Sequence, residues 1–462
     1  MAMTQKQHLI ESLLSQGEIK AGVAAAEALQ ASGGVDETLA LVLLSHARSL
    51  HRMGYFGQQR RLCEIALAAM PDYFEALHLL GFSAQLHGAF AKAEDYYRRA
   101  LASKPDYAFA GLALSQMRMM RTGFVEGLDT YEARWDAVSE ASGPDWRGLP
   151  IPRWRGENLK GKHMYLWAEQ GLGDILMFAS FLPRLLEQAP KRIALGMFPK
   201  LIALFSRSFA SLQLEPIDDA AQHALAPTML TSYPQIEKLA QIAAVPFSLA
   251  PLKASYDYAS RHGLFDFAAP MGDLLVQSMP DYIPARHQGA YLVADPLRVK
   301  QTQSRLAALV AGKRIGISWH TNNTREVTRN IALEQWLALL ATPGCHFISL
   351  QHQMPRQEIE QFCARHNCRI TIDETDISND ADGLAALIAS MDEVITIDNS
   401  NVHLAGALGI KTTLLLPLGC NFRWPSQPDE GTRWYASVKT LRQQNFGDWQ
   451  PVIARAAAAI RS

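Results

Sequence analysis

The spacing of hydrophobic residues divides the chain into two kinds of structure. Over residues 1–135, apolar residues recur at helical intervals, which predicts a series of amphipathic helices. From residue 161 onward, short apolar runs such as 192–197 and 393–397 alternate with helical segments, and this alternation indicates parallel strands covered by helices on both faces. Neither pattern holds over residues 136–160, where prolines and aromatic residues predict a linker.

The helical part contains a repeat. Several residues of the same type are separated by 34 positions, and this period is typical of stacked helical hairpins. The matching pairs are Gly54 and Gly88, Ala66 and Ala100, Pro71 and Pro105, Asp72 and Asp106, and Tyr73 and Tyr107. We therefore expect a turn between two helices at each glycine and the end of a unit at each proline.

These positions resemble the tetratricopeptide repeat family over residues 5–135. The resemblance implies a concave groove that holds an extended peptide or another protein. A different role for such an array is to brace the next domain or to form a homo-oligomer. The repeat predicts a partner but does not identify it.

The alternating part is expected to form two open α/β domains, at residues 161–285 and 286–462. Besides clear strands, the pattern predicts one helix over 176–186, a short strand at 291–293, and further elements at 224–230 and 236–244. Two such domains should face each other across a cleft, with ligands at the carboxyl ends of the strands. The predicted fold class is thus a helical repeat array followed by two facing Rossmann-like domains.

A glycine-rich turn follows the first strand of the alternating part. The segment 169–174 leads from a strand through Gly171 and Gly173 into a helix, and this arrangement presents backbone N–H groups that suit an anion. Asp174 should then lie at the mouth of the cleft. The alternative is that the glycines only turn the chain and that Asp174 only caps the helix.

A second polar turn follows the strand that ends at residue 397. Asp398 closes that strand, and Asn399, Ser400 and Asn401 offer side-chain caps and free N–H groups at a helix start, with His403 in the first helical turn. We interpret this turn as a second anion-binding cradle. The alternative is a routine turn with a capping asparagine.

A third polar loop follows the strand at 314–319. It carries Asn322, Arg325 and Arg329, and the two arginines could bind a diphosphate in a bidentate manner. The alternative is ordinary ion pairing on a solvated loop. If the two domains face each other, the three segments together place an acidic residue opposite groups that bind phosphate.

Charge and cysteine content narrow the class of protein. Lysine plus arginine (44) nearly balances aspartate plus glutamate (45), so no general attraction to nucleic acid or to an anionic membrane follows. The five cysteines are scattered, and Cys363, His366 and Cys368 have no common zinc spacing, so we expect reduced thiols and no metal site. Without a basic and apolar leader or a bilayer-length apolar stretch, we expect a cytoplasmic protein with no integral membrane contact.

From about residue 152 to the end, the chain resembles the two-domain GT-B glycosyltransferases, and most closely the ADP-heptose–lipopolysaccharide heptosyltransferase family. The motifs that carry the resemblance are 169–174, 329–331 ahead of a helix, and 398–404. The resemblance implies inverting, metal-independent transfer from a nucleotide sugar, with no cofactor besides this co-substrate.

The resemblance also implies roles for particular residues. Asp174 would be the catalytic base, Arg329 would bind the donor phosphates, and the turn from Asp398 would hold the donor. Two features depart from the family: Asn399 and Ser400 replace its usual threonine and glycine, and the loop before Arg329 is longer. The sugar and the nucleotide therefore stay open, and we do not carry over ADP-heptose.

These expectations combine into one leading hypothesis and two alternatives. The leading hypothesis is a bacterial protein glycosyltransferase, in which the repeat array captures a surface or flagellar protein and the cleft glycosylates one of its hydroxyl groups. One alternative is transfer to a glycolipid or polysaccharide precursor, with the repeats serving assembly. The other is a non-enzymatic scaffold with a decayed transferase module.

Overall fold

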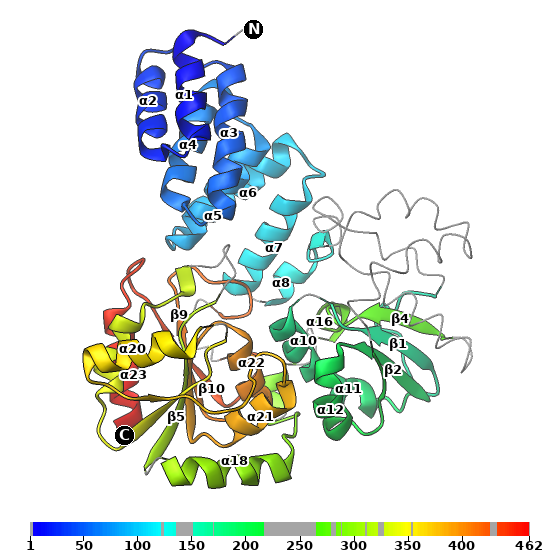
Figure 1. Ribbon diagram of the computed structural model, residues 1–462. Coiled ribbons are helices and arrows are strands. Elements are labelled where there is room, and N and C mark those ends of the chain that lie inside the picture. Colours follow the sequence, from blue (N-terminus) through cyan, green and yellow to red (C-terminus); the bar gives the residue numbers. More distant parts are fainter. Residues whose placement is uncertain are drawn as a thin grey trace, which may run out of the picture.

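The protein consists of a stack of helices above two α/β domains that lie side by side (Figure 1). This computed structural model describes residues 3–121, 124–134, 151–169, 171–216, 265–278, 283–287, 289–309, 312–321, 328–352, 354–425 and 432–461. The predicted fold class, a helical array followed by two parallel α/β sheets, is confirmed. Two predicted segments, 224–230 and 236–244, lie outside the described residues.

The helical array is built from antiparallel hairpins. Its helices are α1 (Gln5–Ser15), α2 (Ile19–Ala31), α3 (Glu37–Arg52), α4 (Phe56–Ala69), α5 (Phe74–Leu86), α6 (Phe90–Ser103), α7 (Ala108–Arg121) and α8 (Phe124–Leu128). Each odd-numbered helix packs against the next even-numbered one. Gly54 and Gly88 have φ angles of 81° and 72° in the turns that join α3 to α4 and α5 to α6. Residues with a side chain rarely adopt this backbone conformation. Glycine therefore occupies these turns, and its spacing contributes to the period of the sequence.

The first α/β domain contains a parallel sheet of four described strands in the order β3-β2-β1-β4. The strands are β1 (His163–Trp167), β2 (Arg192–Met197), β3 (Gln213–Pro216) and β4 (Phe267–Pro270). The helical elements are α10 (Leu172–Phe178), η2 (Ala179–Phe181), α11 (Leu182–Glu187), α12 (Pro199–Ser208), α16 (Asp273–Ser278) and α17 (Pro284–His287). The helix predicted over 176–186 is therefore three shorter pieces, with Pro183 at the start of the last one.

The second α/β domain contains a parallel sheet of six strands in the order β10-β9-β8-β5-β6-β7. The strands are β5 (Lys313–Ser318), β6 (Cys345–Ser349), β7 (Ile370–Thr371), β8 (Glu393–Ile397), β9 (Thr412–Leu416) and β10 (Val438–Arg442). The helical elements are α18 (Pro296–Leu309), η5 (Leu333–Trp336), α19 (Leu337–Leu340), α20 (Arg356–His366), α21 (Ala381–Ala389), α22 (Ser400–Ala407) and α23 (Gln450–Arg461). This strand order is that of a doubly wound dinucleotide-binding fold, with its reversal between β5 and β8.

The strand predicted at 291–293 does not form. The backbone N–H groups of Tyr291 and Leu292 both donate to the carbonyl of Ala407 at the end of α22, each at 3.0 Å, so this segment closes a helix terminus instead. The hydroxyl of Tyr291 donates to the carbonyl of Leu176 in α10 at 2.7 Å. The segment thus ties the two α/β domains together.

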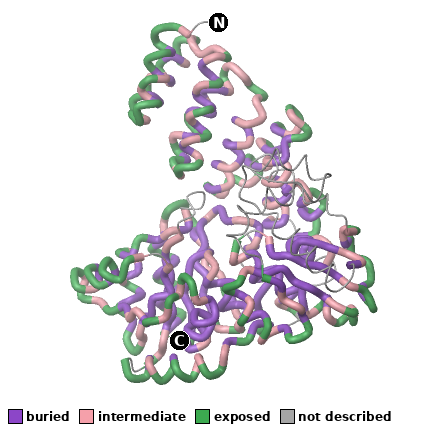
Figure 2. Tube along the Cα trace, turned by 45° about the vertical axis from the view of Figure 1, so that its right-hand side comes forward, coloured by how far each residue is buried: buried purple, intermediate pink, exposed green. Residues whose placement is uncertain are grey.

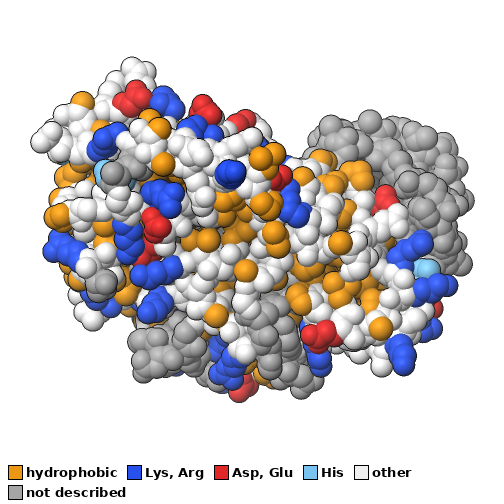
Figure 3. Space-filling view, turned by 90° about the horizontal axis from the view of Figure 1, so that it is seen from below, with side chains coloured by type: hydrophobic (Ala, Val, Ile, Leu, Met, Phe, Trp, Pro, Cys, Tyr) orange, Lys and Arg blue, Asp and Glu red, His pale blue; other side chains and the backbone are white. Residues whose placement is uncertain are grey.

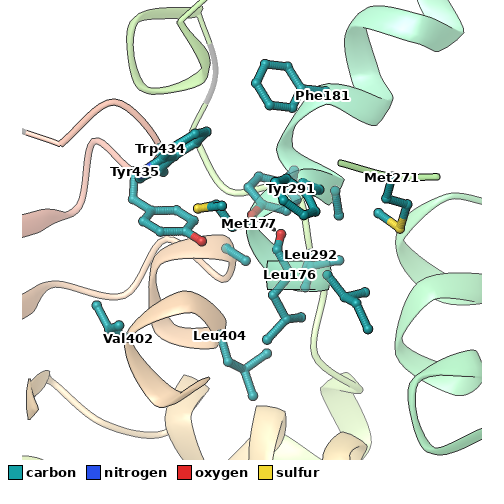
Figure 4. Packing of buried hydrophobic residues seen from close by; sticks show 14 of the residues in the cluster. Leu176, Met177, Phe181, Met271, Tyr291, Leu292, Val402, Leu404, Trp434 and Tyr435 are labelled. Atoms are coloured by element: carbon teal, nitrogen blue, oxygen red, sulfur yellow. Dashed lines mark hydrogen bonds between the residues drawn. The ribbon is translucent and has the colours of Figure 1, made fainter. Parts of the chain in front are cut away.

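The two α/β domains contact each other through helices, with α10 against α22 and α12 against α21. Figure 4 shows Leu176 of α10 on the side of Leu404 of α22 and Met177 beside Tyr435, with the ring of Tyr291 between the two domains. In the second pair, Arg207 of α12 binds Asp382 of α21 with N–O distances of 2.8 and 2.9 Å. The cleft therefore lies above a packed interface.

One hydrophobic core extends through most of the protein. It includes Tyr97 and Met120 of the array, Phe178 of the first α/β domain and Trp434 of the second. The early repeats have a separate core, formed by residues from Ile10 to Leu80. Buried residues accordingly continue from the lower helices of the array into both sheets (Figure 2). The lower array and the α/β domains are one packing unit.

The side of the protein opposite the array exposes hydrophobic, basic and acidic side chains together (Figure 3). All five cysteines are free thiols. Within the described ranges, no helix has both the length and the apolar composition that a membrane crossing requires.

Candidate functional site

A cleft of about 540 Å³ opens where the strands of both sheets end. Its walls come from α10 of the first domain and from the segments that follow β5, β6 and β8 in the second. The position corresponds to the reversal of strand order between β5 and β8, where open α/β sheets bind their ligands. The residues that line the cleft are Gly171, Leu172, Gly173, Asp174, Lys200, His320, Thr321, Arg329, Gln351, His352, Ile377, Ser378, Ala381, Leu384, Asp398, Asn399, Ser400, His403 and Arg423.

Asp174 lies in the first turn of α10 and is only 8% exposed. Its Oδ2 accepts the backbone N–H of Gly171 at 3.3 Å, so the carboxylate caps its own helix. Its Oδ1 accepts from Arg423 of the second domain, from Nε at 2.9 Å and also from Nη2. The carboxylate therefore joins the two domains across the cleft.

Gly173 allows α10 and α22 to approach closely. A Cβ atom placed on Gly173 would lie 2.8 Å from Cδ2 of His403, which is closer than real Cβ contacts. A side chain at this position would push the histidine or separate the helices. The second glycine of the turn is therefore required by the packing between the domains.

Asp398 forms the centre of the second turn. Its Oδ2 lies 2.9 Å from Nη1 of Arg329 and accepts from Nδ2 of Asn421 at 2.9 Å. Burial would raise the pKa of Asp398, but Arg329, Arg423 and the nearby His403 outweigh it and hold the pKa below its usual value. Asp398 is therefore a carboxylate. Burial lowers the pKa of the Arg329 guanidinium, and the negative charge of Asp398 offsets part of this effect.

His403 is a neutral, tightly held ring. Burial lowers its pKa to about 4, and the positive charge of Arg423 acts in the same direction, against the opposing effect of Asp398. Its Nδ1 lies 2.8 Å from the hydroxyl of Tyr435, and its ring stacks on Trp424 with centroids 5.4 Å apart. Nε2 lies 4.0 Å from Asp398. At neutral pH the ring adds polarity to the cleft wall but no charge.

Asn399 and Ser400, which differ from the usual threonine and glycine of the family that the chain resembles, lie where the turn leads into α22. Oδ1 of Asn399 accepts the backbone N–H of Asn401 at 3.0 Å, and its Nδ2 donates to Oγ of Ser318 at 3.1 Å. Asn401 is fully buried and donates to Ser318 at 3.1 Å and to the carbonyl of Leu350 at 2.8 Å. The two asparagines thus link the ends of three strands, and Ser400 at the start of α22 is left facing the cleft.

Most of the residues selected from the sequence meet at this cleft. Those that line it are Gly171, Gly173, Asp174, Arg329, Asp398, Asn399, Ser400 and His403. The side chain of Asn401 points into the second domain instead. Asn322 and Arg325 lie outside the described residues.

The sequence analysis did not select the loop at residues 417–425, which follows β9. Besides Arg423, this loop carries Cys420 and Phe422, which pack against the helical array. Nε2 of Gln85 donates to the carbonyl of Cys420 at 3.3 Å, and the ring of Phe124 lies 6.3 Å from that of Phe422. The sequence does contain a signal for this loop. It follows the carboxyl end of a parallel strand, where ligands bind in such folds, and it holds an arginine among aromatic residues.

The glycine-rich turn is also anchored to the array. Asp273, which is fully buried, accepts from Arg134 just after α8 and from Arg153 at 2.7 and 2.9 Å. The guanidinium of Arg134 also lies 3.6 Å from Glu169, at the start of the glycine-rich turn. Burial raises the pKa of Glu169, although Arg134 opposes this. The buried ion pairs fix where the turn begins.

The protein is therefore a helical-repeat array joined to two facing Rossmann-like domains in the GT-B arrangement, with a polar cleft between them. No protein-family model matches the chain. Its sequence is similar to Protein FlbA of Caulobacter vibrioides, with 29% identity over 434 residues, which are 92% of this chain and 66% of FlbA. The chain thus spans slightly less than two thirds of that relative.

Solved structures similar to this chain include glycosyltransferases. The glycosyl transferase family 9 from Veillonella parvula has 11% identity and a TM-score of 0.43, over 65% of this chain and 92% of that one. E. coli ADP-heptose lps heptosyltransferase II has 14% identity and a TM-score of 0.41, over 65% and 99%. A mutant O-GlcNAc transferase from Thermobaculum terrenum has 14% identity and a TM-score of 0.28, over 91% and 92%. At these values, the fold assignment depends on the strand order of this chain itself.

Proposed function

We propose that the chain is an inverting, metal-independent glycosyltransferase that moves a sugar from a nucleotide-sugar donor to a hydroxyl group of a protein acceptor. One observation carries the proposal: the carboxylate of Asp174 in the first domain faces Arg329, Arg423 and the amino end of α22 in the second, within one cleft. A carboxylate opposite fixed positive groups is what attack by a hydroxyl and departure of a phosphate require.

In the proposed reaction, Asp174 accepts the proton of the acceptor hydroxyl as its oxygen attacks the anomeric carbon. The bond between that carbon and the donor phosphate breaks, and its electron pair stays on the leaving phosphate. Because attack and departure occur on opposite faces of the sugar, the configuration inverts. Proton transfer to a positioned general base contributes roughly 10²–10⁴-fold to a reaction rate.

The leaving phosphate would be stabilised by the second domain. Arg329 and the amino end of α22 supply positive charge that is already fixed in place, so little reorganisation accompanies the reaction. Asn399 supports this geometry because its side chain caps α22 and ties the turn to β5. We therefore assign Gly171, Asp398, Ser400 and His403 to the donor-binding wall, with Arg329 as the phosphate ligand.

The helical array is assigned to acceptor binding. Between α4, α5 and α6 it has a small cavity of about 100 Å³, whose lining includes Arg60, Glu64, Lys92 and Tyr96. Such mixed polar and aromatic walls suit a polypeptide segment. A surface or flagellar protein is the acceptor we favour, by analogy with bacterial fusions of repeats to transferases.

Two measurements test the proposal. Incubation with ADP-, GDP-, UDP- and CMP-linked sugars should raise the melting temperature for one nucleotide class, since a ligand at 100 times its Kd stabilises by about 2.7 kcal/mol. Asp174→Asn should then lose at least about 100-fold in transfer rate. The matched control is Asp266→Asn. It removes a carboxylate at the amino end of β1, the end away from the cleft, and should transfer normally. Equal rates for Asp174→Asn and the unmodified protein would reject Asp174 as the base.

Acceptor recognition is tested separately. Arg60→Glu should raise the acceptor KM and leave hydrolysis of the nucleotide sugar unchanged, because the array cavity lies outside the cleft. Arg98→Glu, an exposed arginine outside that cavity, is the control. If both variants behave alike, the cavity does not bind the acceptor.

A further inference from the structure

The carboxylate assigned as the base has three of its four lone-pair sites occupied by protein donors. Oδ1 of Asp174 accepts both Nε and Nη2 of Arg423, and Oδ2 accepts the N–H of Gly171 at 3.3 Å. A general base must reach the proton that it removes with a free lone pair. Arg423 therefore competes with an acceptor hydroxyl for Oδ1 of Asp174, and Oδ2 keeps one free site beside the N–H of Gly171.

Arg423 is built to keep its backbone still while its side chain turns. Its N–H donates to Oδ1 of Asn421 at 3.1 Å, and its carbonyl accepts from Nε1 of Trp434 at 2.7 Å. The guanidinium lines the same cleft as Arg329 and the amino end of α22. Because arginine has four rotatable side-chain bonds, the guanidinium can leave Asp174 without any movement of the loop.

The charges in the cleft favour such an exchange. Asp174 and Asp398 pair with Arg423 and Arg329, Lys200 adds a further positive charge to the lining, and His403 is neutral at pH 7. Both guanidinium groups are within electrostatic reach of both carboxylates. The negative charge of a donor phosphate complements this positively charged lining, and a phosphate is a strong, bidentate partner for arginine.

We propose that Arg423 is a donor-binding residue that exchanges partners, pairing with Asp174 as in this structure and with the donor phosphate when the donor is bound. Donor binding then releases Asp174 to accept the proton of the acceptor. This inference rests on the proposed function, because it adds a second phosphate ligand to the same site. It also orders the reaction, since donor binding frees Oδ1 of Asp174 for the acceptor hydroxyl.

The test measures nucleotide binding, which does not require transfer. ADP, GDP, UDP, CDP and CMP are titrated calorimetrically into the unmodified protein, Asp174→Asn, Arg423→Gln and the double variant. Asp174→Asn should bind the preferred nucleotide about tenfold more tightly, within the range usual for coupled sites, because Arg423 no longer has to leave a carboxylate. Arg423→Gln should bind it about tenfold more weakly, and Arg423→Lys should recover part of the loss. Asp95→Asn, an exposed carboxylate on α6, controls for net charge.

The double variant separates exchange from simple repulsion. If Asp174 only repels the nucleotide, removing it will tighten binding as much in the Arg423→Gln background as alone, and the inference is wrong. If the gain disappears in that background, Arg423 mediates it. Unchanged affinity in Asp174→Asn overturns the inference while the proposed function stands, whereas no binding of any nucleotide to the unmodified protein or to Asp174→Asn overturns both.

Discussion

Replacing Gly419 by alanine should separate the helical array from the loop that carries Arg423. A Cβ atom on Gly419 would lie 2.1 Å from the carbonyl oxygen of Gln85 and 2.7 Å from Cα of Leu86. Both are backbone atoms at the end of α5, so no rotamer change relieves the clash. The loop or the array has to move.

The cost can be estimated from the contacts that would be lost. Overpacking of a buried site costs about 1–3 kcal/mol, and the hydrogen bond from Gln85 to Cys420 contributes roughly 1 kcal/mol. We therefore expect a loss of about 2–4 kcal/mol, which for a packing unit of this size corresponds to a melting temperature lower by on the order of 2–4 °C. Nucleotide affinity should fall as well, because the same loop positions Arg423.

The assay is thermal unfolding followed by nucleotide titration, with Gly57→Ala as the matched control. Gly57 is exposed in α4 and a Cβ there meets no atom within 4 Å. Alanine at that position should be neutral or stabilise by about 0.4–1 kcal/mol. If Gly419→Ala melts and binds like the unmodified protein, the close approach of the array to this loop is wrong.

Three further predictions concern packing and charge. Arg134→Met should cost about 3–5 kcal/mol in chemical denaturation, because it strips one partner from the fully buried Asp273, and an unchanged midpoint would contradict this. Gly173→Ala should lower the transfer rate about tenfold or more by displacing His403, which kinetics at saturating donor would show and a normal kcat would refute. The His78 ring has its pKa lowered to about 3 by burial, so its contribution to stability is complete above pH 6.5 and is lost as the pH falls toward 3. His78→Phe should flatten the pH dependence of the melting temperature over that window, and an unchanged slope would rule out this account.

Elements buried on all sides were predicted well from the sequence. The strands at 192–197 and 393–397 occupy their predicted residues, because a strand covered on both faces is a continuous apolar run. The repeat was equally visible, since a glycine with positive φ lies at the same point of the first three hairpins. By contrast, β4 was missed, because Phe267–Pro270 is too short and too rich in alanine to stand out.

The site was predicted in outline, and its pairings were not. Neighbouring residues in a helix point about 100° apart, so Ser400 can face the cleft while Asn401 points into the domain. The pairing of Asp174 with Arg423 joins residues that are 249 positions apart, and no local pattern encodes such a contact. Proximity to strand ends identified the region, whereas packing between domains decided which charges meet.

The division of the hydrophobic core indicates where recognition modules could be exchanged. Most buried residues of the early repeats, from Ile10 to Leu80, form one cluster, whereas Tyr97, Met120 and Phe124 pack with the two α/β domains. A chimera joined near residue 135 would replace the array residues that pack against the loop beside the cleft. A junction between the early and late repeats would leave that surface whole, so new binding specificity is best grafted within the solenoid, above its last two hairpins.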